Sequence, residues 1–218
     1  MAQRCIDSWR RYCPDYEIRA WTEDDFDVNE NRYFKEALDA KKWAFASDYA
    51  RLWVLVKHGG VYMDTDVELV ENLDPFLDNG AFSGFESVDC VPTGLMASEP
   101  DHPFMKQLLK EYENRVFKLP DGSFDLTTNV EVITRACVDA GLRLDGSEQE
   151  VAGFRLYPKD YFCPKDHVTG DVKMTHRTVA IHHFDGSWLS PWQRLKKIVK
   201  IAIGPSAVSR FRRILGKE

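Results

Sequence analysis

The chain has 218 residues and a formal net charge of −6; 44% of its residues are hydrophobic and 29% are charged. This length and composition suit one α/β domain with a buried core, and they exclude a compositionally disordered chain. Its apolar runs are shorter than the ~18 residues that cross a bilayer, and its beginning lacks a signal-peptide pattern, so we expect a cytoplasmic protein. The five scattered cysteines form no CxxC pair and are expected to be reduced.

The first half of the chain is expected to alternate short elements: a helix over 2–12, a strand over 16–21, an acidic loop over 22–27 and a helix over 31–41. The clearest helix spans 45–58, where Leu52, Leu55 and Val56 recur at helical spacing. The pair Gly59-Gly60 is a strong signal for the end of that helix.

The second half is expected to supply most of a sheet. Its predicted strands cover 61–66, 81–85, 93–97, 151–157 and 179–184, and its predicted helices cover 102–117 and 129–141. This alternation of strands and helices predicts an α/β sandwich with a mostly parallel or mixed sheet.

The end of the chain differs in charge from the rest. Residues 189–218 contain eight basic residues and one acidic residue, which leaves 21 basic and 34 acidic residues in the body. So acidic a body is not expected to bind nucleic acid. The tail over 192–218 is amphipathic, and two interpretations stay open: a terminal helix packed on the body, or an interfacial helix that meets an anionic membrane at its inner face.

Two aspartates at the end of a predicted strand carry the first functional signal. Asp64 and Asp66 flank Thr65, and alternate residues of a strand point to the same face. Two neighbouring carboxylates are costly unless a cation or hydrogen-bond donors compensate them. The pattern therefore favours a divalent cation that bridges the protein and a nucleotide pyrophosphate, although acids that only cap a turn would leave the same trace.

Several spaced segments resemble glycosyltransferase family 32, the glycosyltransferases with a DXD sugar-binding motif. They are CIDSWRRYCPDYEIRAWTEDDFDVNEN at 5–31, SDYARLWVLVKHGGVYMDTDVEL at 47–69, GFE at 84–86, ASEPDHP at 97–103 and AIHHFDGSW at 180–188. The resemblance implies a GT-A-like fold, a Rossmann-like mixed sheet flanked by helices, over residues 1–191, with the basic tail over 192–218 outside it. It also implies that the first strand of this fold is missing before Met1.

The same resemblance implies a metal-dependent transfer of a sugar from a UDP- or GDP-sugar to a glycan or lipid-linked acceptor. The expected cofactor is Mn²⁺ or Mg²⁺, the expected outcome is retention, and the expected setting is polysaccharide biosynthesis. Two other classes stay open: a non-catalytic or truncated relative that binds a sugar or a partner, and a DxD phosphohydrolase. The phosphohydrolase pattern requires Thr or Val at the position where this chain has Glu68.

Residue roles follow from the resemblance. Asp66 would bind the metal directly, and Asp64 would hold the ribose or a metal-bound water. Asp48 and Arg51 lie three residues apart and would contact the donor sugar, so that these four residues form the expected catalytic set; the alternative for the Asp48–Arg51 pair is a local ion pair.

Further residues complete the expected site. Tyr62, Ser187 and Trp188 are expected to bind the donor. His183 is preferred to His182 as a metal ligand, although strand alternation alone does not decide between them. Thr128 lies in a segment where relatives often carry Gly-Pro; it could contact the sugar or cap the following helix.

Overall fold

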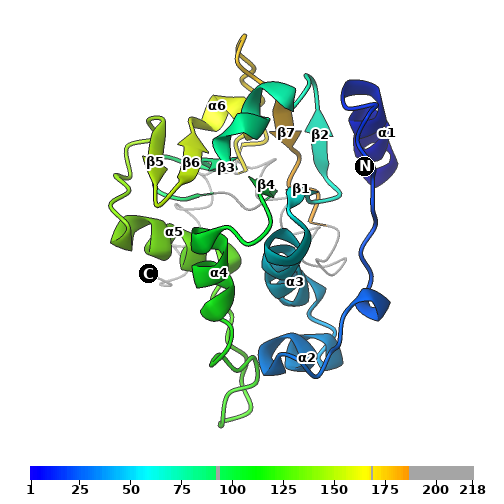
Figure 1. The fold of residues 1–218 in the computed structure, drawn as a ribbon, viewed down its shortest axis with the longest axis vertical. Helices are drawn as coiled ribbons and strands as arrows, with labels where there is room; N and C mark the ends of the chain where they lie inside the picture. Colours follow the sequence, from blue (N-terminus) through cyan, green and yellow to red (C-terminus); the bar gives the residue numbers. More distant parts are fainter. Residues whose placement is uncertain (92–93, 168, 187–218) are drawn as a thin grey trace, which may run out of the picture.

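The computed structural model describes residues 1–91, 94–167 and 169–186. This part of the chain is a mixed α/β structure, in which helices pack against a central mixed sheet (Figure 1). The predicted fold class is confirmed at that level. Ser187, Trp188 and the tail over 192–218 lie outside the described residues.

Four helical segments precede the first strand: α1 (Ala2–Tyr12), the 3₁₀ turn η1 (Glu23–Asp25), α2 (Arg32–Asp39) and α3 (Trp43–His58). The three α-helices confirm the sequence-based assignments. The side chain of Asn31 caps α2 by accepting a hydrogen bond from the Phe34 amide. The strand expected over 16–21 is wrong, because this segment pairs with no strand of the described chain and Ile18 is 39% exposed.

The central sheet has the strand order β1-β4-β3-β6-β5. The strands are β1 (Gly60–Met63), β3 (Ala81–Gly84), β4 (Leu95–Ser98), β5 (Gln149–Val151) and β6 (Phe154–Tyr157). The β3–β6 pair is parallel, and the other neighbours in this sheet are antiparallel. The expectation of a mixed sheet is therefore confirmed. A second, antiparallel sheet pairs β2 (Val67–Leu69) with β7 (Ala180–His182).

The predicted strands are shorter in the structure than expected; the one expected over 179–184, for example, spans only Ala180–His182. The strand expected over 61–66 ends at Met63, and the one expected over 151–157 is a hairpin. Ala152 and Gly153 turn between its two strands, with φ values of 49° and 77°. Glycine suits such a conformation, but the apolar run around it masked the turn.

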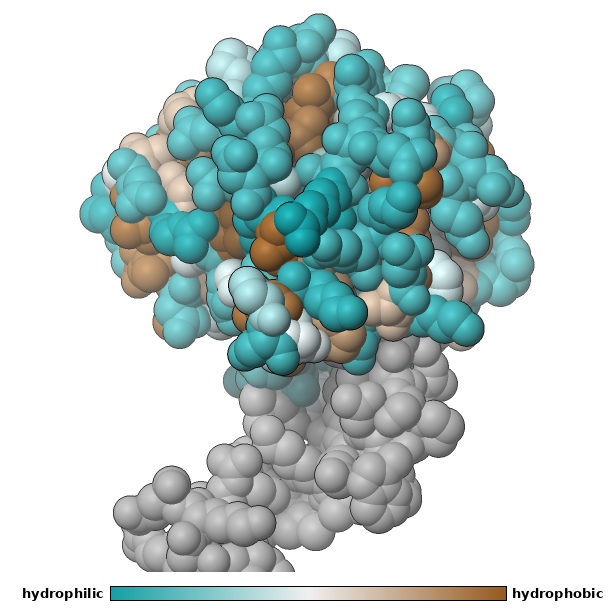
Figure 2. Space-filling view, turned by 90° about the horizontal axis from the view of Figure 1, so that it is seen from below, coloured by the Kyte–Doolittle hydropathy of each residue, from teal (hydrophilic) through white to brown (hydrophobic). Residues whose placement is uncertain are grey.

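The remaining helices cover the sheet. The helix expected over 102–117 is the shorter α4 (Pro103–Lys110), and α5 (Asn129–Asp139) confirms the helix expected over 129–141. The short elements η2 (Asp74–Asn79) and α6 (Lys159–Phe162) were not predicted. Among the described residues, no helix is both long and apolar enough to cross a membrane. Seen from below, the surface is mostly hydrophilic, with separate apolar patches (Figure 2).

The core divides into two clusters, because alternate residues of the central sheet face opposite sides. Met96 and Phe154 belong to the cluster with α2, α3 and α4, whereas Phe82 and Tyr157 belong to the cluster with α1, β2 and β7. Each fully buried side chain of this size stabilises the fold by about 2–3 kcal/mol. Helix α3 thus lies under the β1 end of the sheet (Figure 1). The side of α3 that does not pack into this core can line a site.

Candidate metal and donor site

The end of α3 and the start of β1 are fixed by a glycine. Gly59 has φ of 66°, and a Cβ atom there would lie 2.6 Å from Pro100. Only glycine adopts this positive φ and leaves room for Pro100 without strain. The chain therefore reverses sharply after His58 and runs back along α3, so that the end of β1 returns to the middle of the helix.

The DxD segment is a turn rather than the end of a strand. The Asp64 amide donates to Gly94 O at 2.8 Å, and the Val67 amide donates to Asp64 O at 2.9 Å. These bonds hold the segment between β1 and β2. Both carboxylates project from this turn toward the same site, as expected. A turn places them there, however, and not the alternation of a strand.

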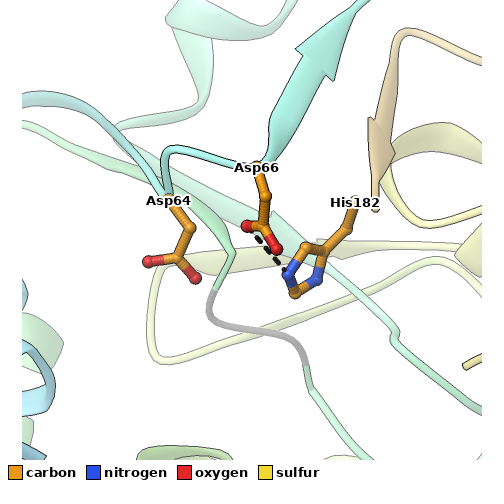
Figure 3. Close-up of side chains that lie close together, drawn as sticks. All are labelled: Asp64, Asp66 and His182. Atoms are coloured by element: carbon orange, nitrogen blue, oxygen red, sulfur yellow. Dashed lines mark ion pairs between the residues drawn. The ribbon is translucent and has the colours of Figure 1, made fainter. Parts of the chain in front are cut away.

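Three possible metal ligands converge at this turn: Asp64, Asp66 and His182. One ligand atom of each lies within 4.8 Å of the others (Figure 3). Ligand atoms at about 2.1 Å from one ion are at most about 4.2 Å apart, so small rotations would seat all three. Two carboxylates with one imidazole fit Mn²⁺ or Mg²⁺ in donor type, because these ions prefer oxygen ligands.

Asp66 is held by the end of β7. His182 Nε2 lies 3.4 Å from Asp66 Oδ1, and the Asp185 amide donates to Asp66 Oδ2 at 2.8 Å. Burial raises the pKa of Asp66, but the hydrogen bond from His182 and the Asp185 amide outweigh it, so the net pKa is lowered. Asp66 is therefore ionised and ready to bind a cation.

The ring of His182 is packed on two sides. Its face lies 4.1 Å from the Phe184 ring, centroid to centroid, and its Nδ1 is buried without a hydrogen-bond partner in the described chain. A Cβ atom at Gly94 would lie 2.9 Å from that nitrogen. The absence of a side chain at Gly94 is therefore what lets the imidazole reach Asp66.

The structure reverses the expected orientation of the two histidines. His183, the preferred ligand, turns away from Asp66, and its Nε2 lies 2.8 Å from Glu68 Oε2. Glu68 also pairs with Arg4 of α1 at 2.8 Å. In the β2–β7 register His182 lies opposite Val67 and so shares its face, whereas His183 falls on the other. Both Ala180 and Ile181 are apolar, so the alternation in the sequence did not reveal this.

Asp48 and Arg51 form one network with the turn. Arg51 Nη2 lies 3.4 Å from Asp48 Oδ1 and 3.3 Å from Asp64 Oδ1. The local ion pair between Asp48 and Arg51 is thus present, but the guanidinium also reaches the DxD turn. Tyr62 donates its hydroxyl to Asp64 at 2.8 Å, and its ring lies 4.7 Å from the Arg51 guanidinium carbon.

Asp48 is a buried carboxylate with a raised pKa. It is only 9% exposed, and its Oδ2 accepts the amide of Asn129, the first residue of α5, at 3.1 Å. Burial raises the pKa of Asp48 to about 6, although Arg51 and the Asn129 amide oppose the rise. Such a raised pKa is typical of functional sites.

Asn129 and its neighbour complete this wall. Thr128 caps α5 by accepting the Glu131 amide at 3.3 Å, which confirms the capping role allowed by the sequence. Asn129 is 1% exposed, and its Oδ1 has no hydrogen-bond partner in the described chain. Sequence reasoning did not reveal the contact between Asn129 and Asp48, since it joins segments 81 residues apart.

These groups line a cleft of about 1120 Å³. Its walls come from α3, the extended segment 16–21, β1 with the DxD turn, the start of α5 and the end of β7. Asp48, Arg51, Tyr62, Asp64 and Asp66 all line it, so every expected site residue in the described chain except His183 meets there. Pockets of this size accommodate ligands larger than a single sugar.

Comparison with known proteins agrees with this geometry. Residues 1–83 match the family described as glycosyltransferase sugar-binding region containing DXD motif. This region of the chain is therefore similar to that family. The match includes Asp48, Arg51, Tyr62 and the DxD turn.

Two of the similar curated proteins come from fungi. The chain is 32% identical over 116 residues to mannosyl phosphorylinositol ceramide synthase SUR1 of Saccharomyces cerevisiae, a match that covers 51% of this chain and 29% of the relative. It is 29% identical over 108 residues to inositol phosphoceramide mannosyltransferase 3 of Schizosaccharomyces pombe, covering 48% and 30%. The chain thus spans about a third of the length of these relatives.

A solved structure, PaToxG glycosyltransferase, is similar with 19% identity and a TM-score of 0.43, over 63% of this chain and 62% of that one.

Proposed function

We propose that this protein is a metal-dependent glycosyltransferase with a GT-A-like domain over residues 1–191. One observation carries the proposal: the Asp64–Asp66–His182 cluster adjoins the Asp48–Arg51–Tyr62 network along one cleft. The cluster has the ligand types for a divalent cation on a diphosphate, and the network presents buried charges and hydroxyls to a polar ligand beside it.

Each residue has a chemical task in this proposal. Asp64, Asp66 and His182 would hold Mn²⁺ or Mg²⁺, which when bound neutralises charge on the departing diphosphate. Arg51 keeps Asp64 oriented and presents a fixed positive charge beside the donor. Asp48 accepts hydrogen bonds from sugar hydroxyls, and its cost of burial falls when a ligand supplies such donors.

The donor is proposed to be a UDP- or GDP-sugar. Mannose is the first sugar to test, because the fungal relatives are named for the transfer of mannosyl groups. The acceptor is proposed to be a glycan or a lipid-linked glycan. Retention, polysaccharide biosynthesis and a cytoplasmic place at the inner face of the membrane complete the proposal; they rest on the resemblance and on the basic tail.

The deciding experiment measures Mn²⁺-dependent binding and hydrolysis of GDP-mannose and a panel of UDP-sugars by the full chain. At least one donor should bind with micromolar to millimolar affinity and lose its binding when EDTA is added. Asp66→Ala should abolish the Mn²⁺-dependent part, whereas Asp171→Ala, an exposed acid outside the cleft, should not.

Two results would favour other classes. Binding of free sugars without metal-dependent turnover would indicate the non-catalytic relative. Hydrolysis of simple phosphomonoesters in preference to sugar nucleotides would indicate the phosphohydrolase. The chain already departs from the pattern of that class at Glu68, which pairs with Arg4 and His183.

A further inference from the structure

One face of α3 runs along the whole donor part of the cleft. Trp43, Ser47 and Arg51 all line the cleft and are spaced four residues apart, so they lie in one row on the helix. Arg51 is at the inner end of this row, against the DxD turn. Trp43 is at its outer end, about 12 Å from Arg51 along the helix axis.

Trp43 is unusual in this row because it is half exposed. Its relative exposure is 50%, and no aromatic ring of the described chain stacks on it. A tryptophan is the largest apolar side chain, and leaving half of it in water forgoes much of the gain from its burial. An exposed tryptophan at the rim of a polar cleft is the kind of group that an incoming ligand covers.

The neighbours of Trp43 are fixed. Phe45, two residues further along α3, has its ring 5.2 Å from that of Phe117, and Asp48 accepts a hydrogen bond from the Asn129 amide. These contacts join the N-terminal end of α3 to the segment before α5. Trp43 therefore stands as an exposed aromatic platform on a part of the backbone that these contacts hold in place.

Polar groups beside this platform favour a sugar over a purely apolar ligand. Asn129 lines the same cleft, and its buried Oδ1 has no hydrogen-bond partner in the described chain. Thr128 also lines the cleft, and its hydroxyl accepts the Glu131 amide, so its proton remains to be donated. A sugar ring has an apolar C–H face for the indole and an equatorial belt of hydroxyls for such groups.

We propose that Trp43 is the stacking platform for a sugar ring of the acceptor glycan, at the end of the cleft that lies beyond the donor sugar. This inference rests on the proposed function. It assigns the metal and the diphosphate to the DxD turn, the donor sugar to Asp48 and Arg51, and the acceptor ring to Trp43. The row on α3 then orders the two substrates along one line.

The test uses the full chain labelled with 5-fluorotryptophan, with Mn²⁺ and GDP present. The Trp43 fluorine resonance is assigned by its loss in Trp43→Phe. The probes are short oligosaccharides of mannose, glucose, galactose and N-acetylglucosamine. At least one should shift the Trp43 resonance in a saturable way, and Trp43→Ala should weaken its binding at least tenfold, whereas Trp43→Phe should weaken it less.

The matched control is Met174→Ala, which removes a 54%-exposed apolar side chain outside the cleft and should change nothing. Transfer to the bound oligosaccharide should fall at least tenfold in Trp43→Ala. If no probe shifts the Trp43 resonance while the donor binds normally, or if Trp43→Ala transfers as well as the wild type, the platform is refuted.

If Trp43→Ala instead loses only binding to anionic vesicles, the residue contacts a membrane and the glycan assignment is wrong. Failure of every donor to bind would refute the proposed function, whereas normal donor binding without a Trp43 shift refutes the platform alone.

Discussion

His182 Nε2 lies 3.4 Å from Asp66 Oδ1 across the β2–β7 pair, whereas the adjacent His183 lies 2.8 Å from Glu68 on the opposite face. Two consecutive residues of one short strand thus serve two different sites. The first completes a cluster of metal-type ligands, and the second joins α1, β2 and β7 through Glu68 and Arg4.

The first prediction separates these histidines. His182→Ala should weaken Mn²⁺ binding at least tenfold, because it removes one of the three ligands. His183→Ala should weaken it by less than about threefold, because its backbone amide still donates to Asp66 O. Isothermal titration with Mn²⁺ in the presence of GDP measures both, and thermal unfolding in EDTA controls for stability. An equal loss in the two variants would contradict the assignment.

Asp48→Asn is predicted to stabilise the fold while it weakens donor binding. Because burial raises the pKa of Asp48 to about 6, the folded protein holds a proton that the unfolded chain releases near pH 4. Stability from this group is therefore lost as the pH rises from about 4 to about 6 and stays constant above that window. The neutral variant avoids this loss, which is at most about 3 kcal/mol.

The measurement is the free energy of unfolding of both proteins between pH 4 and 8 in EDTA. The advantage of Asp48→Asn should be greatest above pH 6 and should vanish near pH 4. A constant difference across this range would mean that Asp48 does not titrate as described. Binding of the sugar nucleotide should fall more than binding of the free nucleoside diphosphate.

Gly94→Ala is predicted to displace a side chain 88 positions further along the chain. Its Cβ would lie 2.9 Å from His182 Nδ1, so the ring must move away from Asp66. Mn²⁺ affinity should fall at least fivefold, and overpacking should cost about 1–3 kcal/mol of stability. The matched control is Gly84→Ala, whose Cβ would lie 2.9 Å from Phe162 Cδ2. That variant should lose comparable stability and keep its Mn²⁺ affinity; parallel losses of affinity would rule out the steric explanation.

Arg115 is predicted to hold the loop before α5. Its guanidinium carbon lies 4.7 Å from the ring centroid of Tyr33 and 4.8 Å from that of Tyr112, and the guanidinium pairs with Asp125 at 2.7 Å. Arg115→Ala should cost about 1–3 kcal/mol in urea unfolding, because it leaves a half-buried carboxylate unpaired. Arg155→Ala, which breaks only more exposed ion pairs, should cost less than about 1 kcal/mol. Equal costs would show that the ring contacts contribute little.

Helices were predicted well because their signals are local. The boundaries of α1 follow from Pro14 two residues after Tyr12, and those of α3 from apolar spacing and Gly59-Gly60. The DxD pair and the Asp48–Arg51 pair were found for the same reason, since each lies within four residues. Local spacing could not show that Arg51 bridges the two pairs.

The errors come from contacts between distant segments. Segment 16–21 has a strand-like pattern, but strand pairing depends on a neighbour that the pattern does not name. The choice between His182 and His183 depended on the β2–β7 register, and β2 itself was not predicted. Gly94 carries no side chain to attract notice, and its importance appears only when His182 lies against it.

Helix α1 covers the edge of strand β2 that does not pair with β7. Strand β2 pairs on one side with β7, and on its other side Trp9 donates to Val67 O at 2.7 Å while Ser8 Oγ accepts the Leu69 amide at 2.9 Å. Two side chains of a helix thus occupy the hydrogen-bonding groups that a further strand would use. An open strand edge recruits other chains into aggregates, so α1 protects the molecule against edge-to-edge association. This protection is absent until α1 docks, which makes the partly folded chain the species in which self-association would begin.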